Sequence, residues 1–266
     1  MDILDKIVAH KQKEVAERKS LYPVKLLEKS LYFQGKTVSL SEYLKREDKS
    51  GIIAELKRKS PSKGDINPFV SVERTSVAYM QAGASALSIL TDQEFFGGKS
   101  EDLTEARKYN FCPILRKDFT IDEYQIIEAK SIGADAILLI AAILDKKEID
   151  QFSRLAHILG MESILEVHNA EELKKISHNV NVIGVNNRDL KTFKTSIKTS
   201  EKLISKIPDS FIRISESGLS EPETVHHLKS IGYDGFLMGE HFMRHSQPGK
   251  ACREFIRQVK ALEKGS

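Results

Sequence analysis

The stretch Ile52-Ile-Ala-Glu-Leu-Lys-Arg-Lys-Ser-Pro-Ser62 decides how the rest of the chain is interpreted. It begins as an apolar β-strand and ends in alternating charges, at Glu55, Lys57 and Lys59, before a Ser-Pro turn. Side chains two residues apart on a strand lie on the same face, so these three side chains point the same way. Because charged groups are costly inside an apolar core, we predict that this strand end opens into a site for an anionic substrate.

Short aliphatic or β-branched runs recur along the chain, and a helical pattern follows each of them. We predict strands at 52–56, 86–90, 113–116, 136–140, 162–167, 182–186, 211–215 and 235–238. We predict helices at 71–82, 100–109, 123–131, 146–158, 170–178, 196–205, 221–230 and 250–263. Strict alternation of this kind indicates parallel strands joined by helical crossovers, and strands this apolar are covered on both faces.

The count of strands and helices indicates the fold class, α/β, with a single (β/α)8 barrel, or TIM barrel. A doubly wound open sheet is the alternative, but it would normally show a glycine-rich fingerprint after the first strand. Here that turn reads Lys-Arg-Lys-Ser-Pro-Ser.

The segment before the barrel carries helical patterns of its own, over 2–18, 23–30 and 40–46. The first is amphipathic, with an apolar face formed by Ile3, Leu4, Ile7 and Val8. We therefore predict an N-terminal helical extension, residues 1–48, packed on a catalytic barrel that spans residues 49–266.

Composition excludes several classes of protein. A net charge of +3 is too small to indicate binding to nucleic acid or to an anionic membrane surface. Two cysteines give no disulfide framework and fit a reducing compartment. The longest wholly apolar run, residues 136–144, is too short to span a bilayer, and the N-terminus lacks the apolar block of a signal peptide. We expect a cytoplasmic protein.

The carboxyl ends of the strands form the active-site face of such barrels, so the residues there are the candidates. These residues are Glu55 and Lys57, Lys117 and Phe119, Glu166, Asn186 and Arg188, Glu216, Ser217 and Gly218, and Gly239. Any one of them could be a solvated strand end or part of a structural ion pair. As a set, two lysines and three glutamates from separate segments predict an acid–base site with shifted pKa values.

The last two loops suggest a phosphate site. Ser217 and Gly218 allow close approach of the backbone, and Gly239 opens a short helical stretch whose N–H groups would face an anion. For Glu240 we assign only the backbone N–H, because its carboxylate would repel a phosphate. The alternative is that the glycines serve tight turns only.

Other reactive residues fit a functional site less well. His241 and His245 have a spacing that suits a metal on a helix, but no third ligand is evident and no metal is expected. Cys112 and Cys252 lie where neither suits a nucleophile. His168 is expected to point away from Glu166.

Several motifs together resemble the indole-3-glycerol-phosphate synthase family. They are Ile53-Ala-Glu-Leu-Lys-Arg-Lys-Ser-Pro-Ser-Lys-Gly, Leu90-Thr-Asp-Gln-Glu-Phe-Phe-Gly-Gly, Pro113-Ile-Leu-Arg-Lys-Asp-Phe, Leu165-Glu-Val-His, Ile183-Gly-Val-Asn-Asn-Arg-Asp-Leu, Ser215-Glu-Ser-Gly and Met238-Gly-Glu. They occur in the family's order, and the N-terminal extension is similar too. The resemblance implies closure of 1-(2-carboxyphenylamino)-1-deoxyribulose 5-phosphate to an indole, with loss of carbon dioxide and water and without a cofactor.

The resemblance also implies roles for individual residues. Lys117 would be the general acid at the substrate carbonyl, and Glu55 and Glu166 would transfer protons in closure and dehydration. Lys57 and Arg188 would contact the substrate carboxylate, and Asn186 would orient the hydroxyls. Glu216 and Ser217 complete the implied catalytic set. The phosphate would be bound by Ser217, Gly218, Gly239 and the backbone of Glu240, with help from Lys59 or Ser60, and the site would be lined by Phe96, Phe119, Leu190 and Leu237. Lys99 stands where a small residue is expected, and we predict that it perturbs its loop only. The enzyme is expected to be a monomer, with at most weak association with pathway enzymes.

Two alternatives stay open at this point. A lysine at a barrel strand end can form a Schiff base, as in a class I aldolase. A barrel can also serve as a non-catalytic binding or scaffold protein, although intact acid–base residues on several strands argue against that interpretation.

Overall fold

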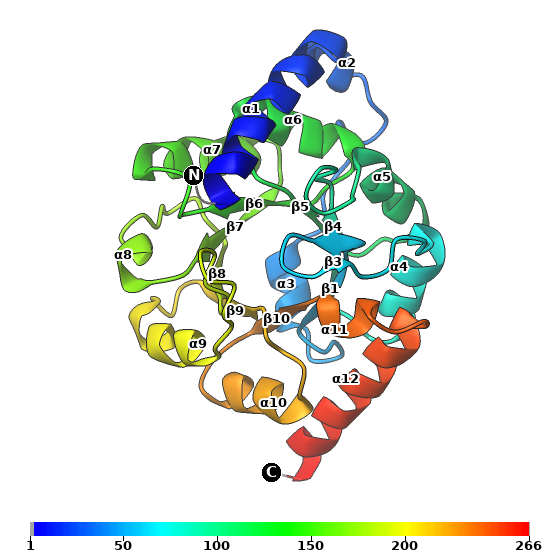
Figure 1. Ribbon diagram of the computed structural model, residues 1–266, viewed down its shortest axis with the longest axis vertical. Helices are drawn as coiled ribbons and strands as arrows, with labels where there is room; N and C mark the ends of the chain where they lie inside the picture. The colour runs from blue at the N-terminus through cyan, green and yellow to red at the C-terminus, as the bar shows by residue number, and fades with distance from the viewer. Residues whose placement is uncertain (1–2, 266) are drawn as a thin grey trace.

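Eight parallel strands close into a barrel in the computed structural model, which describes residues 3–265 (Figure 1). The strands are β1 (Ile52–Leu56), β4 (Ala86–Leu90), β5 (Ile114–Lys117), β6 (Ala136–Ile140), β7 (Glu162–Val167), β8 (Val182–Asn186), β9 (Ile212–Glu216) and β10 (Gly235–Met238). Each pairs with its neighbours in the sequence of strands, and β10 returns to β1. The predicted TIM barrel is confirmed. Two strands end one residue later than predicted, so that Lys117 and Glu216 are the last residues of β5 and β9.

Helices cover the outside of the barrel. They are α4 (Val72–Gln81), α5 (Ser100–Tyr109), α6 (Glu123–Ile132), α7 (Lys146–Ile158), α8 (Ala170–Leu173), α9 (Lys198–Leu203), α10 (Pro222–Ser230) and α12 (Pro248–Gly265). Short pieces η1 (Ile204–Lys206) and α11 (Glu240–Met243) are added to them. Ser71, Asp122 and Asp145 cap α4, α6 and α7 through side chains that accept first-turn N–H groups.

The predicted helix over 170–178 is wrong in length, because α8 ends at Leu173. Beyond it, Lys175 N donates to Glu172 O and Ile176 N to Leu173 O, which are turn-type bonds to the third residue back. The Lys175 ammonium donates to the carbonyls of Ala141 and Leu144, so tertiary contacts hold this segment out of the helix.

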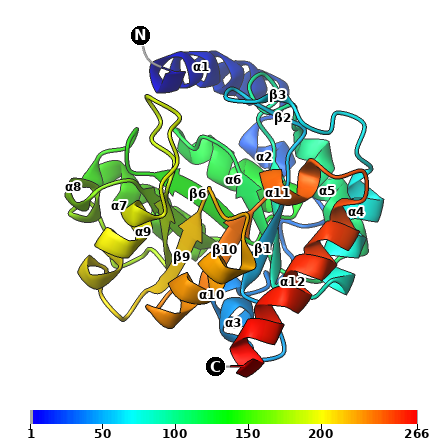
Figure 2. The same cartoon turned by 60° about the horizontal axis from the view of Figure 1, so that its bottom comes forward.

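The N-terminal helices lie at both ends of the barrel. Helix α1 (Ile3–Leu21) crosses one end, beside the hairpin of β2 (Lys59–Ser60) and β3 (Gly64–Asp65), whereas α3 (Leu40–Lys45) lies at the other (Figure 2). A short helix, α2 (Val24–Leu27), follows α1. Leu40 and Leu44 of α3 pack into the barrel's inner core. The face that α1 covers is therefore the one where the strands end.

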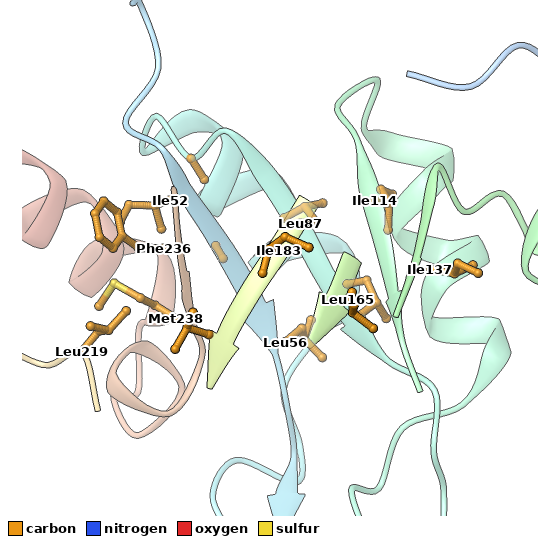
Figure 3. Close-up of a cluster of buried hydrophobic side chains, with 14 of the residues drawn as sticks. Ile52, Leu56, Leu87, Ile114, Ile137, Leu165, Ile183, Leu219, Phe236 and Met238 are labelled. Atoms are coloured by element: carbon orange, nitrogen blue, oxygen red, sulfur yellow. The ribbon is translucent and has the colours of Figure 1, made fainter. Parts of the chain in front are cut away.

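Alternation along the strands separates two apolar cores. One face of each strand packs against the helices, as Ile52 and Leu56 of β1, Leu165 of β7 and Ile183 of β8 do (Figure 3). The other face points into the barrel, where an inner core of residues such as Ile53, Leu115 and Ile164 fills the lower part. In the same inward rows, the positions nearest the strand ends carry Glu55, Lys117, Glu166, Asn186 and Glu216. The strand geometry thus sets charged residues directly above an apolar floor.

No helix within residues 3–265 combines the length and the hydropathy needed to cross a bilayer.

Candidate active site

Six residues from five strand ends meet at the face covered by α1, and we call them the charged cluster: Glu55, Lys57, Lys117, Glu166, Asn186 and Glu216. The Lys117 ammonium lies 2.8 Å from Glu166 Oε2 and 2.9 Å from Glu216 Oε2. Asn186 Nδ2 donates to Glu166 Oε1 at 3.1 Å, and Lys57 Nζ lies 3.1 Å from Glu55 Oε1. All six line one cavity.

Glu166 and Glu216, the two carboxylates that contact the Lys117 ammonium, have pKa values shifted in opposite directions. Burial opposes the charge of Lys117, but Glu166 and Glu216 hold its pKa above the usual range. Burial also raises carboxyl pKa values, yet Lys117 and His168 hold the pKa of Glu166 well below its usual range. For Glu216, burial outweighs the attraction of Lys117, and with repulsion from Glu166 and Glu55 it raises the pKa to about 7. Near neutral pH the cluster therefore contains an ammonium, an ionised carboxylate and a carboxyl group that exchanges its proton easily.

Two glycines make room for the carboxylates of Glu216 and Glu55. A Cβ added at Gly184 of β8 would lie 2.4 Å from Glu216 Oε1, and one added at Gly239 would lie 2.7 Å from Glu55 Oε1. Gly239 thus makes room for Glu55, which is a reason for glycine at this position that is separate from the predicted phosphate site. Among residues 3–265, no group donates a hydrogen bond to Glu216 Oε1, which is buried against Gly184.

His168 contacts the charged cluster, which corrects the expectation that it points away from Glu166. Its Nε2 lies 3.4 Å from Glu166 Oε1 and its Nδ1 lies 3.2 Å from Glu172 Oε2. Burial disfavours the imidazolium, but Glu166 and Glu172 outweigh this effect and raise the pKa of His168 to about 10. The signal was present in the Glu-Val-His spacing, because residues two apart on a strand share a face.

Apolar side chains form part of the cavity wall, and we call this part the aromatic end: Phe96, Phe119, Leu190, Ile3, Leu4 and Ile7. The rings of Phe96 and Phe119 lie 6.0 Å apart between centroids and are inclined by 37°. Ile3, Leu4 and Ile7 come from α1 and were not among the predicted site residues. Their signal was the amphipathic pattern of that helix, whose docking place a local pattern does not reveal.

A second hollow adjoins the first, and the residues that line both include Glu55, Lys57, Arg188, Ser217 and Leu237. We call the part of this hollow formed by Ser217, Gly218, Gly239, Lys63 and Arg244 the anion end. Ser217 and Gly218 have φ values of 68° and 73°, in the left-handed region. A non-glycine residue seldom adopts this conformation, and such residues gather at functional sites.

Glu240 lines the anion end too, but its carboxylate is already paired. Arg188 Nη2 donates to Glu240 Oε2 at 3.0 Å, and Lys63 Nζ lies 3.8 Å from Glu240 Oε1. Arg188 Nη1 also donates to the hydroxyl of Ser62. These contacts tie the loop after β1 to the loops after β8 and β10.

Some predicted residues lie apart from the cluster. Ser60 lines the first cavity, but Lys59 lines neither, and its side chain passes over Gly97. Lys99 is exposed at the start of α5.

Cys112 and Cys252 are buried, and burial raises the pKa of each thiol to about 12. Between Ile3 and Gly265, no three side chains among His, Cys, Asp and Glu are grouped as a metal ion would need.

Known proteins with related sequences share nearly the full length of this chain. The family model described as indole-3-glycerol phosphate synthase matches residues 4–255. An indole-3-glycerol phosphate synthase of Bacteroides thetaiotaomicron is 45% identical over 97% of this chain and 99% of its own length. The enzyme of that name from Thermoanaerobacter pseudethanolicus is 40% identical over 97% and 98%.

Among solved structures, a chain of the tryptophan synthase a2b2 complex from Pyrococcus furiosus superposes with a TM-score of 0.60. The match covers 80% of this chain and 99% of that one. At 14% identity, this likeness concerns the barrel fold alone. The full-length sequence matches, together with a charged cluster at the strand ends of the barrel, show that the chain belongs to the indole-3-glycerol phosphate synthase family.

Proposed function

We propose that this chain converts 1-(2-carboxyphenylamino)-1-deoxyribulose 5-phosphate to indole-3-glycerol phosphate, with loss of carbon dioxide and water. One observation carries the assignment of roles. The Lys117 ammonium lies between two carboxylates whose pKa values are shifted in opposite directions, in a cavity with an aromatic end and an anion end. A substrate with an aryl ring and a phosphate at opposite ends matches that polarity.

The two ends of the cavity orient the substrate. The aryl ring packs against Phe96, Phe119 and Leu190, where the surroundings are apolar. The phosphate lies at the backbone of Ser217, Gly218, Gly239 and Glu240, and the substrate carboxylate faces Lys57 and Arg188. In this orientation the carbonyl to be attacked comes next to Lys117.

Ring closure requires a proton at the carbonyl oxygen as the ring carbon bonds to the carbonyl carbon. Lys117 donates that proton, and the carbonyl becomes a hydroxyl group. Loss of carbon dioxide from the attacking ring carbon then returns the bonding electrons to the ring. Glu216 can resupply the proton to Lys117, because its pKa of about 7 and its distance of 2.9 Å suit proton exchange.

Dehydration removes the new hydroxyl as water and a proton from the adjacent carbon. Glu55 and Glu166 are the carboxylates placed for the proton removal, and Asn186, which donates to Glu166, orients the hydroxyl groups. The geometry disfavours the Schiff-base alternative. A Schiff-base lysine must be a neutral amine to attack, whereas the paired carboxylates hold Lys117 as an ammonium.

The test is turnover of the anilino-ribulose phosphate by the purified protein. Indole fluorescence should appear with time, against a low background because the chain contains no tryptophan. Borohydride added during turnover should leave no adduct on Lys117 or Lys57, whereas a trapped adduct would favour the aldolase mechanism. Absence of indole product with this substrate would contradict the proposal.

For the whole molecule, we propose a cytoplasmic monomer in which residues 1–48 form an extension that completes the cavity and residues 49–266 form the catalytic barrel. Light scattering coupled to gel filtration tests the monomer. A mass of twice 30.0 kDa would contradict it.

A further inference from the structure

Helix α1 carries a lysine whose ammonium is fully buried, although most of the other charged side chains of this helix are exposed. Lys11 has an exposed fraction of 0%, and its Nζ lies 2.9 Å from Asp92 Oδ2, from Asp118 Oδ1 and from Glu14 Oε2. A buried ammonium is costly unless carboxylates compensate it. Burial works against the charge here, but Asp118, Asp92 and Glu14 together hold the pKa of Lys11 above its usual range. The lysine is therefore a permanent cation inside the structure.

The two aspartates are the residues that hold the aromatic walls of the cavity in place. Asp92 follows β4, and its Oδ1 accepts the N–H groups of Phe95 at 2.7 Å and of Phe96 at 3.2 Å. Asp118 follows β5, and its Oδ1 accepts the N–H group of Phe119 at 2.8 Å. Each aspartate thus joins the backbone of one wall to the ammonium of Lys11.

Helix α1 itself completes the aromatic end. Ile3, Leu4 and Ile7 line the cavity, and Lys11 lies one turn beyond Ile7 on the same face. Seating Lys11 between the aspartates therefore also fixes the apolar side chains of α1 relative to Phe96 and Phe119. Figure 2 shows α1 lying across the end of the barrel that contains the site.

We propose that Lys11 is a positioning residue for the aryl half of the substrate, which sets the spacing of the Phe96 and Phe119 walls and seats α1 against them. Lys11 is distant in sequence from the charged cluster and takes no part in proton transfer. This inference rests on the proposed packing of the aryl ring against the two phenylalanines.

The test separates binding from chemistry in Lys11→Met. We expect KM for the substrate and Kd for the product to rise about tenfold, because losing one well-placed aromatic contact weakens binding by about that factor. We expect kcat to stay within about threefold of the parent. Product affinity is measured through its indole fluorescence. The matched control is Lys19→Met, because Lys19 anchors the same helix through Asp122, at 2.7 Å, without contacting either wall. Its KM and Kd should stay within about twofold of the parent.

A second variant distinguishes failure of this inference from failure of the proposed ring site. Phe119→Ala should weaken product binding by itself, and combining it with Lys11→Met should weaken binding by less than the sum, because both act on the same wall. If Phe119→Ala leaves Kd unchanged, the ring site is wrong. If Phe119→Ala weakens binding but Lys11→Met does not, only the role of Lys11 is overturned.

Folding is monitored by circular dichroism and thermal unfolding. Should Lys11→Met fail to fold, Lys11→Gln takes its place, since the amide keeps a donor near the aspartates and the same rise in KM and Kd is expected. A lowered melting temperature with unchanged KM and Kd would assign Lys11 a merely structural role and overturn the inference.

Discussion

Replacing Gly184 by alanine tests how closely the barrel positions Glu216. The added Cβ would lie 2.4 Å from Glu216 Oε1, 3.2 Å from Ile164 Cγ2 and 3.4 Å from Ile214 Cγ1. An ordinary contact begins near 3.4 Å, so the carboxylate has to retreat by about 1 Å. A misplacement of that size in an active site costs on the order of 10²-fold in rate, and overpacking a filled core costs about 1–3 kcal/mol of unfolding free energy.

The assay is kcat from indole fluorescence near neutral pH, together with the free energy of unfolding in urea. We expect kcat of Gly184→Ala to fall about 10²-fold. In a Glu216→Ala background the same substitution should cost much less stability, because the clashing carboxylate is gone. Gly184→Ala with kcat within about threefold of the parent and unchanged stability would refute the view that Gly184 exists to admit Glu216.

Two further predictions concern charge. Glu216 has a pKa of about 7 in the folded protein, above its usual value of 4.5. Between these values the native state binds more protons than the unfolded state, so the stability associated with neutral Glu216 is lost as pH rises through this window. The unfolding free energy of the parent minus that of Glu216→Gln should fall from about pH 5 to about pH 8, and a flat difference would contradict the shift. His168→Gln removes a cation 3.4 Å from Glu166, so the pKa of Glu166 should rise and the acid limb of the kcat/KM profile should move to higher pH. An acid limb that stays in place would show that His168 does not act on Glu166.

Much of the barrel could be predicted from the sequence because its strands are short apolar runs, and five of them carry polar or charged residues at or near their ends. Ile52–Leu56 is apolar until Glu55, and Lys57 follows at once. In such a strand, the inward-facing positions therefore predict both the core and the site. Helix α8 was overestimated because its end depends on Lys175 reaching two carbonyls after β6, a contact that no local pattern encodes.

Residues missed at the site depend on tertiary geometry. The docking of α1 places Ile3, Leu4 and Ile7 in the cavity and buries Lys11 between two loops, and a helical pattern alone does not say where the helix packs. The need for glycine at 184 follows only from the position of the Glu216 carboxylate on the neighbouring strand. His168, in contrast, was predictable, since the two-residue period of a strand places it beside Glu166.

The central claim, that Lys117 is the acid of ring closure, is tested most directly by comparing turnover and product affinity in Lys117→Met. We expect kcat/KM to fall on the order of 10³-fold or more, with product Kd within about tenfold of the parent because the aromatic and anion ends are intact. Turnover by Lys117→Met within tenfold of the parent rate would contradict the mechanism.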